Sequence, residues 1–161
     1  MKNTNHIVVL VGVCGIGKTT IGAQLAKELD VPFYDVDKLP YAEVSEKSVD
    51  IHKWLSEVQG LILKHVSQKG CVLSCSILKK EHRKTLTATI DYPLDWVFMN
   101  DSFENASRRV EVIQEHNRPV SLLKSDFETL EVPKRALTVD MDNTEQVIVD
   151  TILKYLARKY G

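Results

Sequence analysis

The fold of this chain is decided by VVLVGVCGIGKTT, residues 8–20. An apolar run leads into a glycine-rich loop, and one lysine and two threonines follow at once. The run is too short for a core helix, so it predicts a buried strand over residues 6–12. Beyond the loop, apolar residues recur at helical spacing and predict a helix over residues 18–29.

The loop between this strand and this helix has the pattern G-x-x-x-x-G-K-T. Its glycines permit backbone angles that let successive N–H groups cradle phosphate oxygens, and the helix that follows adds the positive end of its dipole. Lys18 is expected to reach the β and γ phosphates, and the Thr19 hydroxyl is expected to ligate Mg²⁺. The pattern therefore predicts a nucleoside triphosphate site and by itself does not choose between ATP and GTP. The predicted cofactor-binding residues of this segment are Gly12, Val13, Cys14, Gly15, Ile16, Gly17, Lys18, Thr19 and Thr20.

Strand and helix patterns alternate along the rest of the chain. Such alternation predicts an α/β protein whose parallel sheet is covered by helices on both faces, with ligands bound beyond the carboxyl ends of the strands. Asp101 with Glu104, and Asn143 with Gln146, have the spacing of helix starts. The further strands are expected at 31–37, 71–75, 94–100 and 136–142, and the further helices at 49–68, 79–88, 102–113, near 125 and after Asn143.

The overall composition is that of an ordinary globular protein. The chain has 161 residues, 43% of them apolar and 27% charged, which predicts a single domain over 1–161. Its formal net charge of −1 provides no field that would gather nucleic acid or an anionic membrane, so neither is an expected partner. The sequence shows no basic and apolar leader and no apolar run near the roughly 20 residues that span a bilayer, so a cytoplasmic protein is expected.

The cysteines and histidines predict neither a disulfide nor a metal centre. Cys71 and Cys75 lie four residues apart in an expected strand, which places their Cα atoms ~13 Å apart, too far for a disulfide. The five histidines have no metal-ligand spacing with one another or with cysteine.

Two carboxylates follow the phosphate loop. Asp35 and Asp37 stand two residues apart in FYDVD, so in an extended strand both would project to the same side. One is expected to hold a water on Mg²⁺, and the other to orient an acceptor hydroxyl and accept its proton. The alternative is a pair of solvated loop acids. The guanine-reading pattern N-K-x-D is missing and the chain is short, so these features favour a kinase of small metabolites.

Three segments carry a resemblance to a known family. They are VGVCGIGKTTIGAQLAKELDVPFYDVD at 11–37, CVLSCSILKKEHRKTL at 71–86 and LLKSDFETLEVP at 122–133. The second is similar to the pattern C-S-A-L-K-K-x-Y-R, and the third to L-L-x-S-Q-F-E-T-L-E-x-P. With these motifs the chain resembles the gluconokinase family, the small phosphate-loop kinases of sugar acids that are related in fold to shikimate kinase.

The resemblance implies a five-stranded parallel sheet of order 2-3-1-4-5, a short lid at about 114–122, and phosphorylation of gluconate to 6-phosphogluconate by ATP with Mg²⁺. By the same resemblance, Asp37 is the candidate general base and substrate-orienting residue, and Asp35 lies near the metal. Ser76, Lys79 and Arg83 match positions that face the acceptor, where a cation suits the carboxylate of a sugar acid.

The sequence departs from the family pattern in two places. Segment 38–53 is shorter than its family counterpart, with Ile51 where the family has an arginine, and Ile113 replaces the second lid arginine. Arg118 is the candidate catalytic replacement in the lid, and Arg109 is the candidate contact with adenine. These departures leave two alternatives open, a nucleotide-binding regulatory protein with a degenerate acceptor site and a kinase for another polyol acid such as shikimate. The apolar face of helix 49–68 also allows a homodimer.

Overall fold

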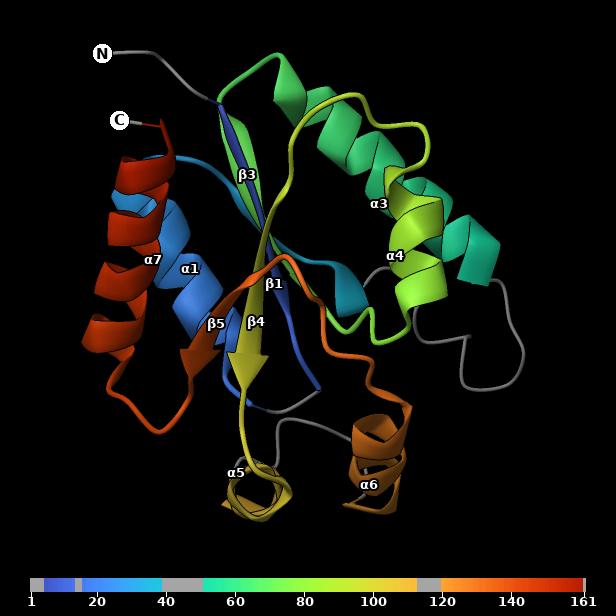
Figure 1. Ribbon diagram of the computed structural model, residues 1–161, viewed down its shortest axis with the longest axis vertical. Coiled ribbons are helices and arrows are strands. Elements are labelled where there is room, and N and C mark those ends of the chain that lie inside the picture. The colour runs from blue at the N-terminus through green and yellow to red at the C-terminus, as the bar shows by residue number, and fades with distance from the viewer. Residues whose placement is uncertain (1–4, 14–15, 39–50, 113–119, 161) are drawn as a thin grey trace.

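The structure is a computed structural model that describes residues 5–13, 16–38, 51–112 and 120–160. Five parallel strands form one sheet in the order β2-β3-β1-β4-β5, as the resemblance implied (Figure 1). Each strand pairs in parallel with its neighbours, so all five carboxyl ends meet at one edge of the sheet. The strands are β1 His6–Val11, β2 Phe33–Asp35, β3 Gly70–Cys75, β4 Asp95–Asn100 and β5 Leu137–Asp140.

The helices complete three layers. Helices α1 and α7 cover one face of the sheet, α3 and α4 cover the other, and α5 and α6 lie beyond the carboxyl edge (Figure 1). The predicted α/β/α arrangement is therefore confirmed. The helices are α1 Lys18–Leu29, α3 Ile51–Val66, α4 Lys80–Thr87, α5 Phe103–Val112, α6 Val120–Thr129 and α7 Glu145–Tyr160, and Val36–Lys38 forms the 3-10 turn η1.

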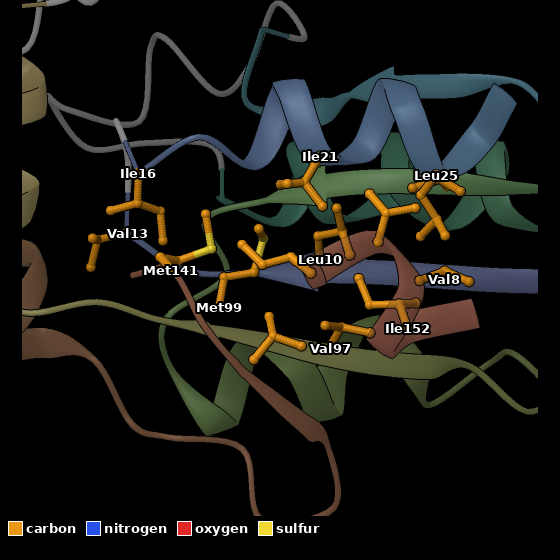
Figure 2. Packing of buried hydrophobic residues seen from close by; sticks show 14 of the residues in the cluster. Val8, Leu10, Val13, Ile16, Ile21, Leu25, Val97, Met99, Met141 and Ile152 are labelled. Carbon is orange, nitrogen blue, oxygen red and sulfur yellow. The ribbon is translucent and has the colours of Figure 1, made fainter. Parts of the chain in front are cut away.

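Strand β1 is apolar from Ile7 to Val11 because these residues are buried on both faces of the sheet. Val8 and Leu10 belong to the core layer under α1 and α7, which Figure 2 shows with Ile21 and Leu25 of α1 above the strand. Ile7 and the other alternate residues of β1 belong to the layer under α3 and α4. A strand with helices on both faces reads as a continuous apolar run, which is how the sequence indicated it.

Two helices begin one residue later than expected. The cap of α5 is Ser102, whose hydroxyl accepts the N–H of Asn105 at 3.1 Å, and the cap of α7 is Thr144, whose hydroxyl accepts the N–H of Val147 at 3.3 Å. The expected starts at Asp101 and Asn143 are therefore wrong by one position. A hydroxyl one residue before the first helical residue accepts the N–H three residues on, and the sequence pattern does not distinguish it from the neighbouring acid or amide.

Two further expectations can be compared with the structure. Cys71 and Cys75 are both free and buried, which confirms that they do not form a disulfide. Within the described ranges, no helix is both long and apolar enough to cross a bilayer.

Candidate active site

The phosphate loop connects the end of β1 to the start of α1. Gly17 precedes α1 with φ 94° and ψ 16°, a left-handed conformation that glycine adopts at little cost. At Gly12, an added Cβ would lie 2.7 Å from Cδ1 of Ile16 and 3.2 Å from the carbonyl oxygen of Met99. Gly17 is thus required by its backbone conformation, whereas a side chain at Gly12 would crowd Ile16 and the Met99 carbonyl oxygen. Cys14 and Gly15, also predicted to bind the cofactor, lie outside the described residues.

Lys18 reaches across this loop with its side chain only 4% exposed. Its ammonium group donates hydrogen bonds to the carbonyl oxygens of Gly12 and Val13 and, at 2.6 Å, to the hydroxyl of Ser76. It also lies 3.6 Å from Oδ2 of Asp37. A buried ammonium group is expensive to desolvate unless it is paired, so Asp37 balances this charge.

Asp37 and Ser76 are held together by two hydrogen bonds. Oδ1 of Asp37 accepts the backbone N–H of Ser76 at 2.9 Å, and Oδ2 accepts the Ser76 hydroxyl at 2.6 Å. The same hydroxyl oxygen accepts the bond from Lys18. Because these residues follow neighbouring strands at the carboxyl edge, the sheet brings them together, and we call them the Lys18–Ser76–Asp37 cluster.

Asp35 has different partners from Asp37. Its Oδ2 accepts the hydroxyl of Thr19 at 3.1 Å, and its Oδ1 accepts the backbone N–H of Asp37 at 3.1 Å. The expectation that the strand would stay extended through Asp37 is wrong, because β2 ends at Asp35 and the chain turns into η1. A carboxylate that bonds the N–H two residues on stabilises such a turn. The turn directs the Asp35 side chain to Thr19 and the Asp37 side chain to the position of the other two residues that form the cluster.

The pair formed by Thr19 and Asp35 suits a magnesium ion. Mg²⁺ prefers oxygen ligands, commonly binds through one or two protein groups and keeps several waters. A hydroxyl and a carboxylate oxygen lie 3.1 Å apart here, and the Thr19 side chain is exposed to solvent. The residues present therefore fit the ion that the sequence predicted.

The two predicted cations of the acceptor site differ in their surroundings. Lys79 is exposed and immediately precedes α4. Arg83 is 8% exposed, and its guanidinium group donates to the carbonyl oxygens of Ile77, Leu78 and Glu131 at 2.9, 3.0 and 2.6 Å. Burial lowers the pKa of Arg83, and the nearby Glu131 partly offsets this effect. The structure thus uses Arg83 to tie the start of α4 to the segment after α6 and does not bring it to the cluster.

The remaining predicted residues are only partly described. Thr20 is exposed in the first turn of α1. Arg109 lies in α5, but its side chain is outside the described part of the structure, as is Arg118. The predicted lid at 114–122 overlaps the first turn of α6, and its other residues are not described.

One positioning residue was not predicted from the sequence. The indole N–H of Trp54 donates to the carbonyl oxygen of Val36 at 2.8 Å. It thereby anchors the turn that presents Asp37, a role that the apolar face of the predicted helix 49–68 did not indicate.

Comparison with known proteins identifies the family. A model described as shikimate kinase matches residues 14–156, and a probable gluconokinase from Xenopus tropicalis is 34% identical, with 95% of this chain and 94% of the relative covered. The chain belongs to the shikimate kinase family, among the gluconokinases. A gluconokinase of Gluconobacter oxydans is 31% identical to this chain, and the match covers 93% of this chain and 90% of the relative.

Solved structures agree with this assignment. The crystal structure of a gluconokinase from Sinorhizobium meliloti 1021 has a TM-score of 0.82 and 30% identity, and the match covers 98% of this chain and 94% of that one. A shikimate kinase structure from Aquifex aeolicus has a TM-score of 0.60 at 20% identity, which supports the fold alone. The predicted resemblance to gluconokinases is therefore confirmed.

Proposed function

We propose that this protein is an ATP-dependent kinase that transfers the γ-phosphoryl group of ATP to the terminal hydroxyl of gluconate, giving 6-phosphogluconate. The observation that carries the proposal is the Lys18–Ser76–Asp37 cluster beside the Thr19–Asp35 pair. Lys18 and the Thr19–Asp35 pair suit the phosphates of a nucleotide and its magnesium ion. Asp37 presents its carboxylate to the hydroxyl of the acceptor.

Each residue has a role that follows from its contacts. The acceptor hydroxyl oxygen attacks the γ phosphorus, the bond from that phosphorus to the β,γ-bridging oxygen breaks, and Asp37 takes the hydroxyl proton. Ser76 fixes both oxygens of the Asp37 carboxylate and so sets its direction. Lys18 offsets the negative charge of the transferring group. Thr19 and Asp35 would hold Mg²⁺, which neutralises phosphate oxygens when bound.

On the acceptor side, Lys79 is the described cation that is free to meet the carboxylate of a sugar acid, because its side chain is exposed. Direct binding by Arg83 stays a prediction, since its guanidinium group is already bonded to three carbonyl oxygens. Arg118 as the lid arginine and Arg109 as the adenine contact likewise stay predictions, as do a cytoplasmic location and a homodimer.

The test is ADP release in a coupled assay with gluconate, other sugar acids and shikimate as acceptors. We expect turnover with gluconate, and a loss of about 10²–10⁴-fold in kcat for Asp37→Asn, because that is the usual contribution of a positioned general base. Turnover that survives Asp37→Asn would remove this residue as the base. A protein that binds Mg·ATP in calorimetry but turns over no acceptor would instead be a nucleotide-binding regulator.

A second series tests the metal and the lid. Thr19→Ala should raise the Mg²⁺ concentration needed for half-maximal activity, since one of two protein oxygen ligands is lost. Arg118→Ala should lower kcat with little change in the melting temperature. If Arg118→Ala turns over gluconate normally, another residue serves the transferring phosphoryl group.

A further inference from the structure

A cleft of about 520 Å³ lies between α4 and the segment 131–135. This segment leads from α6 toward β5 (Figure 1). The backbone N–H of Glu131 donates to the carbonyl oxygen of Leu78 at 2.9 Å, which holds the segment against the start of α4. The volume is in the range of small-molecule sites. We call it the α4 cleft.

The α4 cleft is separate from the cluster and the Thr19–Asp35 pair, and Arg83 is the one predicted acceptor contact that lines it. None of the residues described above in the cluster or the Thr19–Asp35 pair lines it. Trp96 lines it and lies four residues before Asn100, the carboxyl end of β4. At a rise of ~3.3 Å per residue, this part of the cleft lies ~13 Å behind the edge of the sheet where the cluster is found.

The cleft concentrates positive charge. Its lining residues include five cations and one acid, Glu131, a formal sum of +4 in a chain whose net charge is −1. Four of these cations have exposed side chains, and we call them the basic rim. Within the described structure, no ion pair neutralises any of the four. The basic rim consists of Lys80, Lys84, Lys134 and Arg135.

The fifth cation makes the cleft rigid. Arg83 is buried and fixed by bonds to three carbonyl oxygens from both walls, which join α4 to the opposite segment. Within the described residues Glu131 forms no ion pair with the rim, and its Oε1 accepts the backbone N–H of Lys80 at 3.2 Å. The positive charges are thus presented on a preformed surface.

The inner part of the cleft is apolar. Trp96 and Pro133 are half-buried and form what we call the apolar floor. A flat indole with cations beside it suits a ligand that has a ring to stack and an anionic group to pair. An open-chain polyol acid has no such ring, so the floor does not match the proposed substrate.

We infer that the α4 cleft is a second ligand site, which binds a small phosphate ester that carries an aromatic ring. The ring lies against the apolar floor, and the phosphate oxygens accept hydrogen bonds from the basic rim. This inference is independent of the proposed kinase function, because it uses no residue of the cluster.

The test is isothermal titration calorimetry with 1-naphthyl phosphate as the probe. The double variant Lys84→Glu with Arg135→Glu should weaken binding at least about tenfold, because two attractive contacts become repulsive. The matched control, Lys154→Glu with Arg158→Glu on exposed positions of α7, makes the same change of charge and should leave Kd within about twofold. Equal weakening by both pairs would show a non-specific charge effect and overturn the inference.

Two more variants identify the site. Lys18→Ala should leave the Kd of the probe unchanged. If Lys18→Ala no longer binds the probe, the probe lies in the phosphate loop and the inference is overturned. Trp96→Leu should weaken 1-naphthyl phosphate at least about fivefold but not inorganic phosphate, because only the ring stacks. Equal binding of the probe to Trp96→Leu would also overturn it. The Lys84 and Arg135 variant should keep its turnover of gluconate, so failure of the kinase assay in the unaltered protein would count against the proposed function alone.

Discussion

At the scale of single residues, Ser76 links the two charged members of the cluster. Ser76→Ala removes the hydroxyl that bonds Lys18 and Asp37 but keeps the backbone N–H that donates to Asp37. We expect kcat/KM for gluconate to fall about tenfold to a hundredfold, because a hydrogen bond to a charged group contributes about 1.5–3 kcal/mol. Steady-state kinetics with gluconate as the acceptor measures the change.

Ser76→Thr is the matched control, since it keeps a hydroxyl at the same position. It should retain most of the activity that Ser76→Ala loses, with both variants folded by circular dichroism. If Ser76→Ala turns over gluconate as well as the unaltered protein, the hydroxyl does not orient Asp37 during the reaction.

The members of the site were predictable from the residues, whereas the assignment of Asp35 to the metal side and Asp37 to the acceptor side came only from the resemblance. The motif names Lys18 and Thr19 because phosphate chemistry needs a cation and a hydroxyl at that spacing. Which acid meets which partner depends on the end of β2, where the Asp35 carboxylate bonds the Asp37 backbone and turns the chain. A strand pattern alone does not show where a side-chain carboxylate takes the backbone N–H that would otherwise pair with the neighbouring strand.

At the scale of elements, α1 packs on β2 through a glycine. An added Cβ at Gly22 would lie 2.3 Å from Cε1 of Phe33, so the helix can approach the strand this closely only without a side chain there. Gly22→Ala should lower the free energy of unfolding by about 1–3 kcal/mol, as overpacked cores do. Urea denaturation followed by circular dichroism measures it.

Gly60 is the matched position for that experiment. It lies in the interior of α3 with nothing within 4 Å of an added Cβ. Gly60→Ala should therefore stabilise the protein by about 0.5–1 kcal/mol through helix propensity. Should Gly22→Ala stabilise as much as Gly60→Ala, the Phe33 ring would have room to move and the close packing would not be required.

Helix α3 is joined to β2 by a buried histidine. His65 is 5% exposed, and its Nε2 lies 2.9 Å from the Tyr34 hydroxyl. Burial lowers the pKa of His65 below its ordinary value of 6.5, and the neighbouring Lys64 lowers it further. His65 therefore binds a proton less readily in the folded state than in the unfolded chain. The free energy of unfolding should fall as the pH drops below about 6.5.

Urea midpoints at about pH 7.5 and about pH 5.5 measure this pH dependence. His6 and His82 also have pKa values lowered mainly by burial and should contribute in the same direction. His65→Gln should reduce the difference between the two midpoints. An unchanged difference would assign the acid sensitivity to the other histidines.

Element types were easier to predict than element ends. The apolar spacing of helix 18–29 identified α1 with its observed bounds, because a helix packed on a sheet needs one apolar face. The starts of α5 and α7 were each displaced by one residue, since neighbouring polar residues can all cap a helix and only the backbone geometry selects Ser102 and Thr144.

At the scale of the whole molecule, the order of the strands depends on contacts between distant segments. The resemblance supplied this order, and the continuous apolar run of β1 is consistent with its central place between two core layers. No pattern indicated that α7 is fastened to β4. Asp95 and Lys159 are 64 positions apart, and each alone reads as an ordinary surface charge.

Asp95 forms a buried anchor for the C-terminal helix at the edge of the sheet opposite the candidate active site. Its carboxylate is 1% exposed and accepts Lys159 Nζ at 2.7 Å and the Tyr160 hydroxyl at 2.9 Å. Lys159→Met removes the ammonium group that pairs with the buried Asp95 carboxylate, so the free energy of unfolding in urea at neutral pH should fall by about 1–3 kcal/mol.

Lys154→Met, an exposed change on the same helix, should stay within about 0.5 kcal/mol of the unaltered protein. Equal stability of the two variants would mean that Tyr160 alone satisfies Asp95. Turnover of gluconate by folded Lys159→Met should be unchanged, because the anchor and the cluster lie at opposite ends of the strands.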